Sequence, residues 1–308
     1  MKHTIITREP FSFEQTLTFI RRFAPCQAET IVTEDSVTAA VSVGRRAWPF
    51  TLRGHRNLTI ETPDEAPPSI ARRAADWIGA NDDLGALYEA AESDPPFRAL
   101  VRTLHGLHQV RFLGLEEITV YCVMMQRTPI KMATRYKSKF LDRFGHQVRV
   151  GDRTLRAMPE LPELATLDDG DIAKAIGHPA KAARIAAVVR GVAEIGEDFL
   201  RTATYADARD ALLAIPGIGP FSATAILLRG LGRVNELPSI GMFADDGRAL
   251  YGRAWNEQAI ARRYGDQIGY WSFYVKTGAA RLTGRSSIVG THAPGGSVTS
   301  TRCVPVGS

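Results

Sequence analysis

Residues 206–232, ADARDALLAIPGIGPFSATAILLRGLG, hold a tight turn rich in proline and glycine, IPGIGP, between two segments with helical patterning. Apolar residues recur at helical spacing on both sides of the turn: Ala208, Ala211 and Leu212 before it, and Phe221, Ala225 and Leu228 after it. Two glycines around one aliphatic residue allow positive φ and leave room for a bulky partner. The second helix would begin with exposed backbone N–H groups, where the helix dipole favours an anion. The stretch therefore predicts two helices joined by a turn that can bind phosphate without a charged side chain.

A simple connection between two packed helices would explain the turn alone. The longer string LLAIPGIGPFSATAI, residues 212–226, resembles the helix-hairpin-helix motif of the base-excision DNA glycosylases, in particular the 3-methyladenine DNA glycosylase II-like branch. The resemblance implies that the hairpin holds duplex DNA. The DNA-binding residues it implies here are Pro216, Gly217, Ile218, Gly219 and Phe221.

Composition is compatible with this function. The chain has 308 residues, 44% of them hydrophobic and 23% charged, as in an ordinary globular protein of two domains or one large one. A formal net charge of +5 fits a nucleic-acid partner, although many basic proteins never bind DNA. No apolar run is long enough to span a membrane, and the start MKHTIITREPF lacks a signal-peptide core. We expect a monomeric cytoplasmic protein associated with the nucleoid.

Cysteine usage argues against an iron–sulfur cluster. Cys26, Cys122 and Cys303 are far apart, and no Cys/His pair has metal-ligand spacing, so neither a zinc site nor a cluster is expected. No cofactor is required. The resemblance does imply that backbone carbonyls of the hairpin can hold a monovalent cation, Na⁺ or K⁺. These carbonyls would belong to Leu213, Ile215 and Ile218.

The pattern predicts an α+β fold. Short alternating segments up to residue 62 read as strands, with helices expected at 13–23 and 68–78. The expected strands are Thr4–Thr7, Thr30–Thr33, Val37–Val43, Pro49–Leu52 and Leu58–Ile60. This order resembles the TATA-binding-protein-like sheet domain of the same branch, and we assign it to residues 1–83. Residues 84–282 are expected to form an all-α glycosylase core of two helical subdomains, with a polar loop at 151–162. Residues 283–308 are expected to be a flexible tail.

The segment 116–145 resembles the part of the family in which a helix ends at a glutamine before the next helix. Gln126 matches that glutamine, and Arg127 stands where relatives carry a wedge that fills the gap left by an extruded base. Many wedges are aliphatic, so Arg127 departs from them, and an ordinary surface residue explains it equally well. The next helix is basic, which indicates either a solvated face or a DNA contact. Its cations are Lys131, Arg135, Lys137, Lys139 and Arg143.

The resemblance implies a monofunctional enzyme that flips alkylated or otherwise modified bases out of duplex DNA and hydrolyses the N-glycosidic bond. Bifunctional relatives carry a nucleophilic lysine two residues after the second hairpin glycine. Phe221 occupies that position here, so lyase chemistry is not expected. Phe221, Ala225 and Trp271 are the expected base pocket, with Ala225 giving it more room. Core packing is the competing explanation for Trp271.

The expected catalytic aspartate is missing from its usual place. A carboxylate is needed to stabilise the positive charge that develops on the sugar. The family carries it just after a Leu-Pro pair, but this chain reads Leu237-Pro238-Ser239-Ile240. If the loop has extra residues, Asp246 is favoured over Asp245, with Glu236 a distant third. If it has none, the aspartate is lost, and the chain is a DNA-binding relative that is non-catalytic or specialised for another modified base.

Overall fold

The computed structural model describes residues 1–54 and 57–282. The tail expected at 283–308 lies outside the described residues. The N-terminal part contains β1 (Lys2–Ile5), α1 (Phe13–Arg22), β2 (Ile31–Val32), β3 (Ser36–Val43), β4 (Arg46–Gly54), β5 (Leu58–Glu61) and α2 (Ser69–Trp77). Its five strands form an antiparallel sheet in the order β1-β5-β4-β3-β2. The predicted α+β fold with an N-terminal antiparallel sheet is confirmed.

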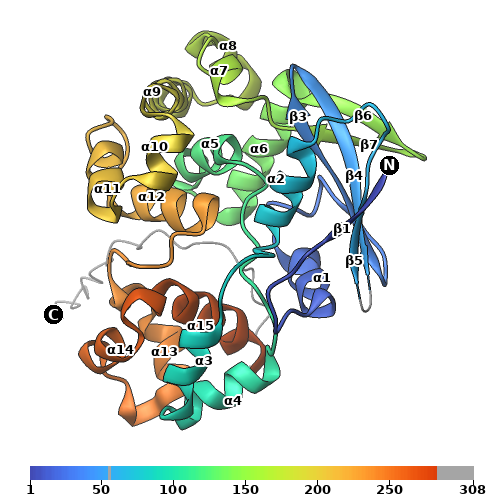
Figure 1. The fold of residues 1–308 in the computed structure, drawn as a ribbon. Helices are drawn as coiled ribbons and strands as arrows, with labels where there is room; N and C mark the ends of the chain where they lie inside the picture. The colour runs from blue at the N-terminus through green and yellow to red at the C-terminus, as the bar shows by residue number, and fades with distance from the viewer. Residues whose placement is uncertain (55–56, 283–308) are drawn as a thin grey trace, which may run out of the picture.

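The sheet packs one face against α1 and α2 (Figure 1). Val37, Ala39 and Val41 alternate along β3 and are almost completely buried on this side. The rings of Phe50 on β4 and Trp77 on α2 meet edge to face, with their centroids 5.9 Å apart. The alternating apolar residues of the strands therefore form the core between the sheet and its two helices, as the sequence pattern predicts.

The helices gather in two groups (Figure 1). The upper group contains α5 (Leu115–Met125), α6 (Ile130–Phe144), α7 (Leu161–Leu164), α8 (Asp169–Ile176), α9 (Pro179–Ile195), α10 (Glu197–Thr202), α11 (Tyr205–Leu213), α12 (Pro220–Ala225) and the π-helical turn η1 (Ile226–Gly230). The lower group contains α3 (Gly85–Glu92), α4 (Pro95–Thr103), η2 (Ile240–Phe243), α13 (Ala244–Tyr251), η3 (Gly252–Ala254), α14 (Glu257–Tyr264), η4 (Gly265–Gln267) and α15 (Ile268–Leu282). The chain starts the lower group, builds the upper one and then returns to complete the lower.

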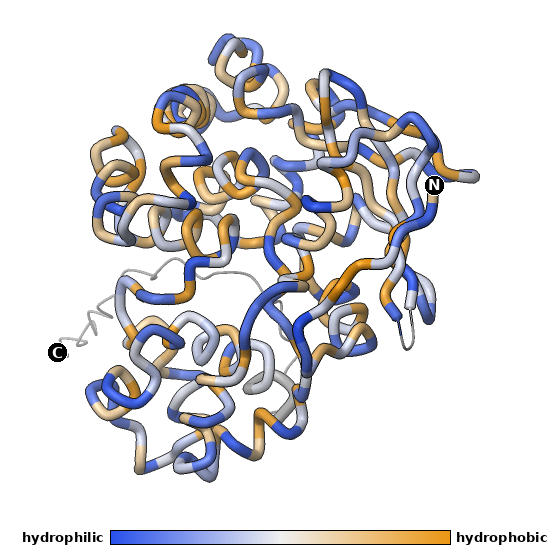
Figure 2. The backbone as a smooth tube through the Cα atoms, viewed as in Figure 1, coloured by the Kyte–Doolittle hydropathy of each residue, from blue (hydrophilic) through white to orange (hydrophobic). Residues whose placement is uncertain are grey.

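Helix α5 is the centre of the upper group. All of its residues except Glu117 are buried, because neighbouring helices cover it on every side. Figure 2 shows hydrophilic residues mainly on the outer turns and loops, and hydrophobic ones toward the middle of each group. Within the described residues, no helix combines the length and the hydropathy needed to cross a bilayer.

The predicted polar loop at 151–162 is wrong. Two strands, β6 (His146–Val150) and β7 (Arg153–Ala157), pair as a hairpin there, followed by α7, so the region after residue 84 is not entirely helical. Leu155 and Ala157 of β7 are buried against Ala40 and Ala47 of the N-terminal sheet. The hairpin thus covers the outer face of β3 and β4. Polar residues such as Arg156 alternate with these apolar residues. The segment therefore looks polar in sequence although one face of β7 is buried.

Candidate functional site

The hairpin between α11 and α12 has the expected turn. Gly217 has φ +99°, in the left-handed region that favours glycine, whereas Gly219 has φ −105° and precedes α12 in extended conformation. The expectation of positive φ therefore holds at Gly217 and not at Gly219. Ile215 and Ile218 point inward and are 7% exposed, and the Ile218 N–H donates to the Ile215 carbonyl at 3.0 Å. Pro216 and both glycines remain exposed on the outside of the turn.

The loop after α5 lies directly against this hairpin. The Gln126 side chain donates through Nε2 to the Gly217 carbonyl at 2.8 Å and to Ser222 Oγ at 3.3 Å. The next residue, Arg127, is exposed and has φ +52°, which is unusual for a residue other than glycine. Two segments that are 91 positions apart in sequence are thus joined by one amide.

The start of α9 supplies two further cations, for which the sequence alone suggested no role. Lys181 is buried, and its ammonium donates to the carbonyls of Gln126 at 2.8 Å and Val123 at 3.3 Å. Burial, with a smaller effect of the nearby Arg184, lowers the pKa of Lys181. Arg184 is exposed, and its Nη1 donates to Gln126 Oε1 at 2.8 Å. The only sequence signal was the position of both residues at the start of the helix that precedes the hairpin.

The three residues expected in the base pocket come from both helical groups. Phe221 is half-buried and Ala225 is 4% exposed, both on α12. Trp271 on α15 is completely buried, stacks on Trp255 with centroids 6.2 Å apart, and donates to Tyr251 Oη at 3.0 Å. These contacts give Trp271 a packing role in the lower group. A role of these residues in base recognition stays a prediction.

The candidate acids differ sharply in their surroundings. Asp245, in the first turn of α13, has a fully exposed side chain 3.7 Å from Arg248. Asp246 Oδ2 accepts from Lys276 of α15 at 2.9 Å, and both side chains are 26% exposed. Asp246 is therefore the more enclosed of the two.

Two other positions were considered for the catalytic carboxylate, and both lie in or just before η2. Ile240 begins this turn and packs its half-buried side chain against the core. Glu236, the third candidate, pairs with Arg209 of α11 at 2.9 Å. Neither position places an unpaired carboxylate beside the hairpin.

The carbonyls expected to bind a cation belong to Leu213, Ile215 and Ile218. The Ile215 carbonyl already accepts from Ile218 and keeps a second lone pair, so one more interaction is compatible with its geometry. Elsewhere in the described part of the chain, no group of three or more His, Cys, Asp or Glu side chains is placed to hold a metal ion.

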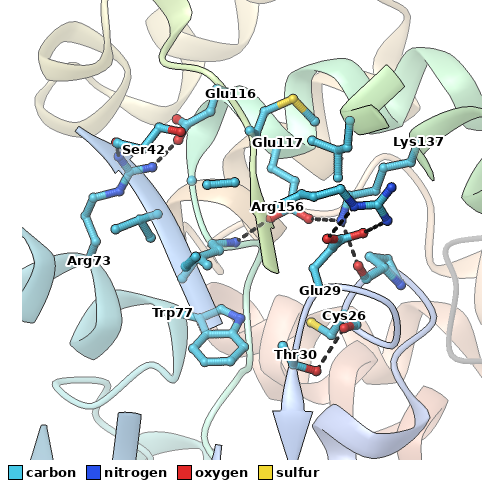
Figure 3. Close-up of a pocket in the computed structure, with 18 residues that line it drawn as sticks. Cys26, Glu29, Thr30, Ser42, Arg73, Trp77, Glu116, Glu117, Lys137 and Arg156 are labelled. Atoms are coloured by element: carbon cyan, nitrogen blue, oxygen red, sulfur yellow. Dashed lines mark hydrogen bonds and ion pairs between the residues drawn. The ribbon is translucent and has the colours of Figure 1, made fainter. Parts of the chain in front are cut away.

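A charged seam joins the N-terminal sheet to the upper helices (Figure 3). We use "seam" for Glu29, Arg73, Glu116, Glu117, Lys137 and Arg156. Arg73 pairs with Glu116, Lys137 with Glu117, and Arg156 with Glu29 at 2.6 Å. The seam lines part of a small, partly open pocket of about 30 Å³, which is large enough to admit water. Because each charge already has an opposite partner, the seam is structural.

A larger cleft of about 510 Å³ lies beside the seam, among α2, α7 and α10. It has a mixed charged lining, including Arg72, Asp76, Glu160, Glu197 and Arg201. Neither cavity is lined by hairpin residues. The hairpin is contacted instead by Gln126 and by residues of α9, among them Arg184 and Val188 beside Gly217.

No family model matches this chain. A curated relative, the DNA-3-methyladenine glycosylase of Bacillus subtilis (strain 168), is 27% identical over 206 residues, covering 63% of this chain and 68% of the relative. A second, the probable bifunctional transcriptional activator/DNA repair enzyme AlkA of Mycobacterium tuberculosis, is 31% identical over 159 residues. That match covers 51% of this chain and only 31% of the longer relative.

Solved structures share the fold over nearly the whole chain. The 3-methyladenine DNA-glycosylase from Archaeoglobus fulgidus aligns with a TM-score of 0.71 and 19% identity, covering 89% of this chain and 97% of that one. The Clostridium acetobutylicum 8-oxoguanine glycosylase/lyase, solved with duplex DNA, aligns with a TM-score of 0.68 and 14% identity, covering 92% and 98%. In sequence the chain is similar to DNA-3-methyladenine glycosylases, and in fold to solved DNA glycosylases, which supports the helix-hairpin-helix DNA glycosylase superfamily.

Proposed function

We propose that this protein is a monofunctional DNA glycosylase that excises alkylated or otherwise modified bases from duplex DNA. The observation that carries the proposal is the Gln126 side chain, which ties the candidate wedge loop to the Gly217 carbonyl of the hairpin. A base can be extruded only if one element holds the backbone while another fills the gap, so the two must be fixed relative to each other. The B. subtilis and A. fulgidus proteins named above support alkylated bases as the substrate class.

The proposed chemistry requires one carboxylate near the sugar. As the bond to the base breaks, positive charge develops on the sugar, and a nearby carboxylate stabilises it or activates water. We assign this role to Asp246, because its partial burial and its bond to Lys276 hold the carboxylate in a defined position. Asp245 has no comparable restraint, since its side chain is fully exposed.

Release of free base from methylated duplex DNA tests this assignment. We expect Asp246→Asn to slow release about 10²- to 10⁴-fold, the usual contribution of such a group. Asp245→Asn is the matched control, because it makes the same change one residue earlier on α13, and it should retain the parent rate. Parent-like release by Asp246→Asn would remove the assignment.

We also propose that the enzyme lacks lyase activity, because Phe221 cannot form a Schiff base at the position where lyases carry lysine. Borohydride trapping on an abasic duplex should give no covalent adduct. A covalent adduct formed by the parent protein would contradict this part of the proposal. An adduct lost in Lys276→Met would identify the lysine beside Asp246 as the nucleophile.

A second candidate is a relative that binds DNA without excising bases. The observations that favour it are Ile240 in the expected acid position, the exposure of Asp245, and the neutralisation of Asp246 by Lys276. Such a protein would bind duplex DNA containing modified bases and release none of them. Base release by the parent protein excludes this candidate.

The proposed enzyme acts as a monomer and needs no cofactor. We propose that it can hold Na⁺ or K⁺ at the Leu213, Ile215 and Ile218 carbonyls. DNA affinity measured at constant ionic strength should then depend on which monovalent cation is supplied.

A further inference from the structure

Arg184 stands directly beside the hairpin turn. A Cβ atom built on Gly217 would lie 2.7 Å from Arg184 Cγ and 3.1 Å from its Cδ, so the side chain runs across the glycine. The residue is exposed, and it comes from α9, outside the hairpin itself. Gly217 thus has two neighbours at once, with Gln126 on its carbonyl and Arg184 over its α-carbon.

The hydrogen-bond partner of Arg184 is neutral. Its Nη1 donates to the amide oxygen of Gln126 at 2.8 Å, whereas the seam arginines Arg73 and Arg156 are paired with carboxylates. A neutral acceptor fixes the direction of the guanidinium and leaves its full positive charge. The positive charge of Arg184 also lowers the pKa of Lys181, although burial of the Lys181 ammonium is the larger cause.

A charged guanidinium whose hydrogen-bond partner is neutral can bind a phosphodiester group. It has five N–H donors in a rigid planar fork, and the bond to Gln126 uses one of them. The remaining donors can meet two phosphate oxygens together, as arginine does at phosphate sites. Because Gln126 already holds the side chain, less conformational entropy is lost when an anion arrives.

We propose that Arg184 binds a backbone phosphate of the DNA strand that lies on the hairpin, adding a charged side-chain contact to the backbone N–H groups of the turn. This rests on the proposed DNA binding, and it names a residue that the hairpin motif does not include. Gln126 then has two tasks: it joins the loop to the hairpin, and it aims the arginine. The contact reads charge rather than base, so it acts equally on damaged and undamaged DNA.

The test is the salt dependence of duplex affinity, measured for an undamaged duplex and for one carrying an abasic-site analogue. Each phosphate contact contributes a slope of about 0.9 in the plot of log affinity against log salt. We expect Arg184→Gln to lower this slope by about 0.9 on both duplexes, and to weaken binding about tenfold near 0.1 M salt. Thermal melting should be unchanged, since the side chain is exposed.

Three variants separate charge from position. Arg190→Gln removes another exposed arginine from the same helix and should keep the parent slope. Arg184→Lys should restore the slope with weaker binding, because lysine is a point charge without the fork. Gln126→Met breaks the bond that aims Arg184 but keeps the charge, so affinity should fall with the slope retained.

An unchanged slope in Arg184→Gln, with the parent binding DNA, would overturn the proposal. The readout needs no base release, so a parent protein that binds duplex but excises nothing would sink the glycosylase activity and leave the Arg184 contact standing. A parent that binds no duplex even at low salt would overturn both.

Discussion

Gly217 and Gly219 lie two positions apart in the same turn, but the backbone of the free protein requires glycine only at the first. Gly217 has φ +99° and Arg184 across its α-carbon, whereas Gly219 has φ −105° and nothing within 4 Å of the point where a side-chain methyl group would lie. An alanine at 217 must therefore adopt a strained conformation and push the arginine aside. An alanine at 219 meets neither obstacle.

We expect Gly217→Ala to lower the free energy of unfolding by about 1–3 kcal/mol, the usual cost of a residue forced into left-handed backbone. Gly219→Ala should leave it within about 0.5 kcal/mol of the parent, as for an open surface site. Urea denaturation of the three proteins side by side measures both. Equal stability of the two variants would show that the turn relaxes easily and that position 217 is not strained.

Cys26 and Cys122 give a second prediction at this scale. Both are free and buried, and burial raises the pKa of each thiol to about 12. Since the thiolate is the reactive form, almost none exists at pH 8, where an exposed cysteine would react. In a Cys303→Ser variant, we expect no thiol to react with Ellman's reagent in the native state and both remaining thiols to react in denaturant. Rapid reaction of a native thiol would contradict the burial.

The site was only partly predictable from single residues. Gln126 could be singled out because its position at the end of an apolar helix resembles a family segment, but its contact with the hairpin came only from the structure. Arg184 could not be found this way, since its role depends on a contact across the fold to Gly217 that no local pattern encodes. The sequence already favours Asp246 over Asp245, and the structure adds that the Asp246 side chain is the less exposed of the two. The catalytic role of Asp246 stays a prediction.

At the scale of elements, α6 divides its positive charge between surface and core. The sequence shows a run of cations with no sign that they differ. Lys131, Arg135, Lys139 and Arg143 are not buried, but Lys137 is buried, pairs with Glu117 and donates to the Pro25 carbonyl at 2.7 Å. Burial alone would lower the pKa of Lys137, but the adjacent Glu117, together with Glu29, outweighs it, so that the pKa is raised.

We expect Lys137→Met to cost about 3–5 kcal/mol of unfolding free energy, because it leaves the Glu117 carboxylate without its partner. Lys139→Met, two residues along the same helix and outside the core, should change it by no more than about 0.5 kcal/mol. Urea denaturation at neutral pH measures the difference. If the two variants were equally stable, Lys137 would have to be solvated rather than buried.

The hairpin β6–β7 shows why one element escaped prediction. Its buried residues, such as Leu155 and Ala157, alternate with arginines, so a window of this length reads as polar. The strands β3 and β4 were predictable because their apolar residues are denser, and they are dense because both faces are covered. The β6–β7 hairpin covers the second face. It is far from these strands in sequence: His146 and Ser42, which are hydrogen-bonded, are 104 positions apart.

For the whole molecule, the sheet domain and the helices share one core. A single hydrophobic cluster contains Phe50 and Trp77 of the N-terminal part together with Tyr121 and Tyr274 of the two helical groups. Arg229, whose pKa burial lowers to about 10, lies between the rings of Phe19, Phe23 and Phe273. Two ion pairs of the seam, Arg73–Glu116 and Arg156–Glu29, cross the same junction, and Lys137 crosses it through its bond to the Pro25 carbonyl.

Because of this shared core, we expect a single thermal unfolding transition despite the domain boundary assigned at residue 83. Calorimetry should give a van't Hoff enthalpy close to the calorimetric one, the signature of two-state unfolding. Two resolved transitions would mean that the sheet and the helices unfold independently.

The open space around Gly219 has a consequence for which substitutions survive selection. Folding alone does not require a glycine there, so any such requirement must come from what approaches the turn from outside. In a mutational scan scored by soluble expression, variants at 217 should be depleted and variants at 219 tolerated. Scored by survival of cells treated with a methylating agent, both positions should be depleted. Comparing the two scans would separate what the turn needs in order to exist from what it needs in order to work.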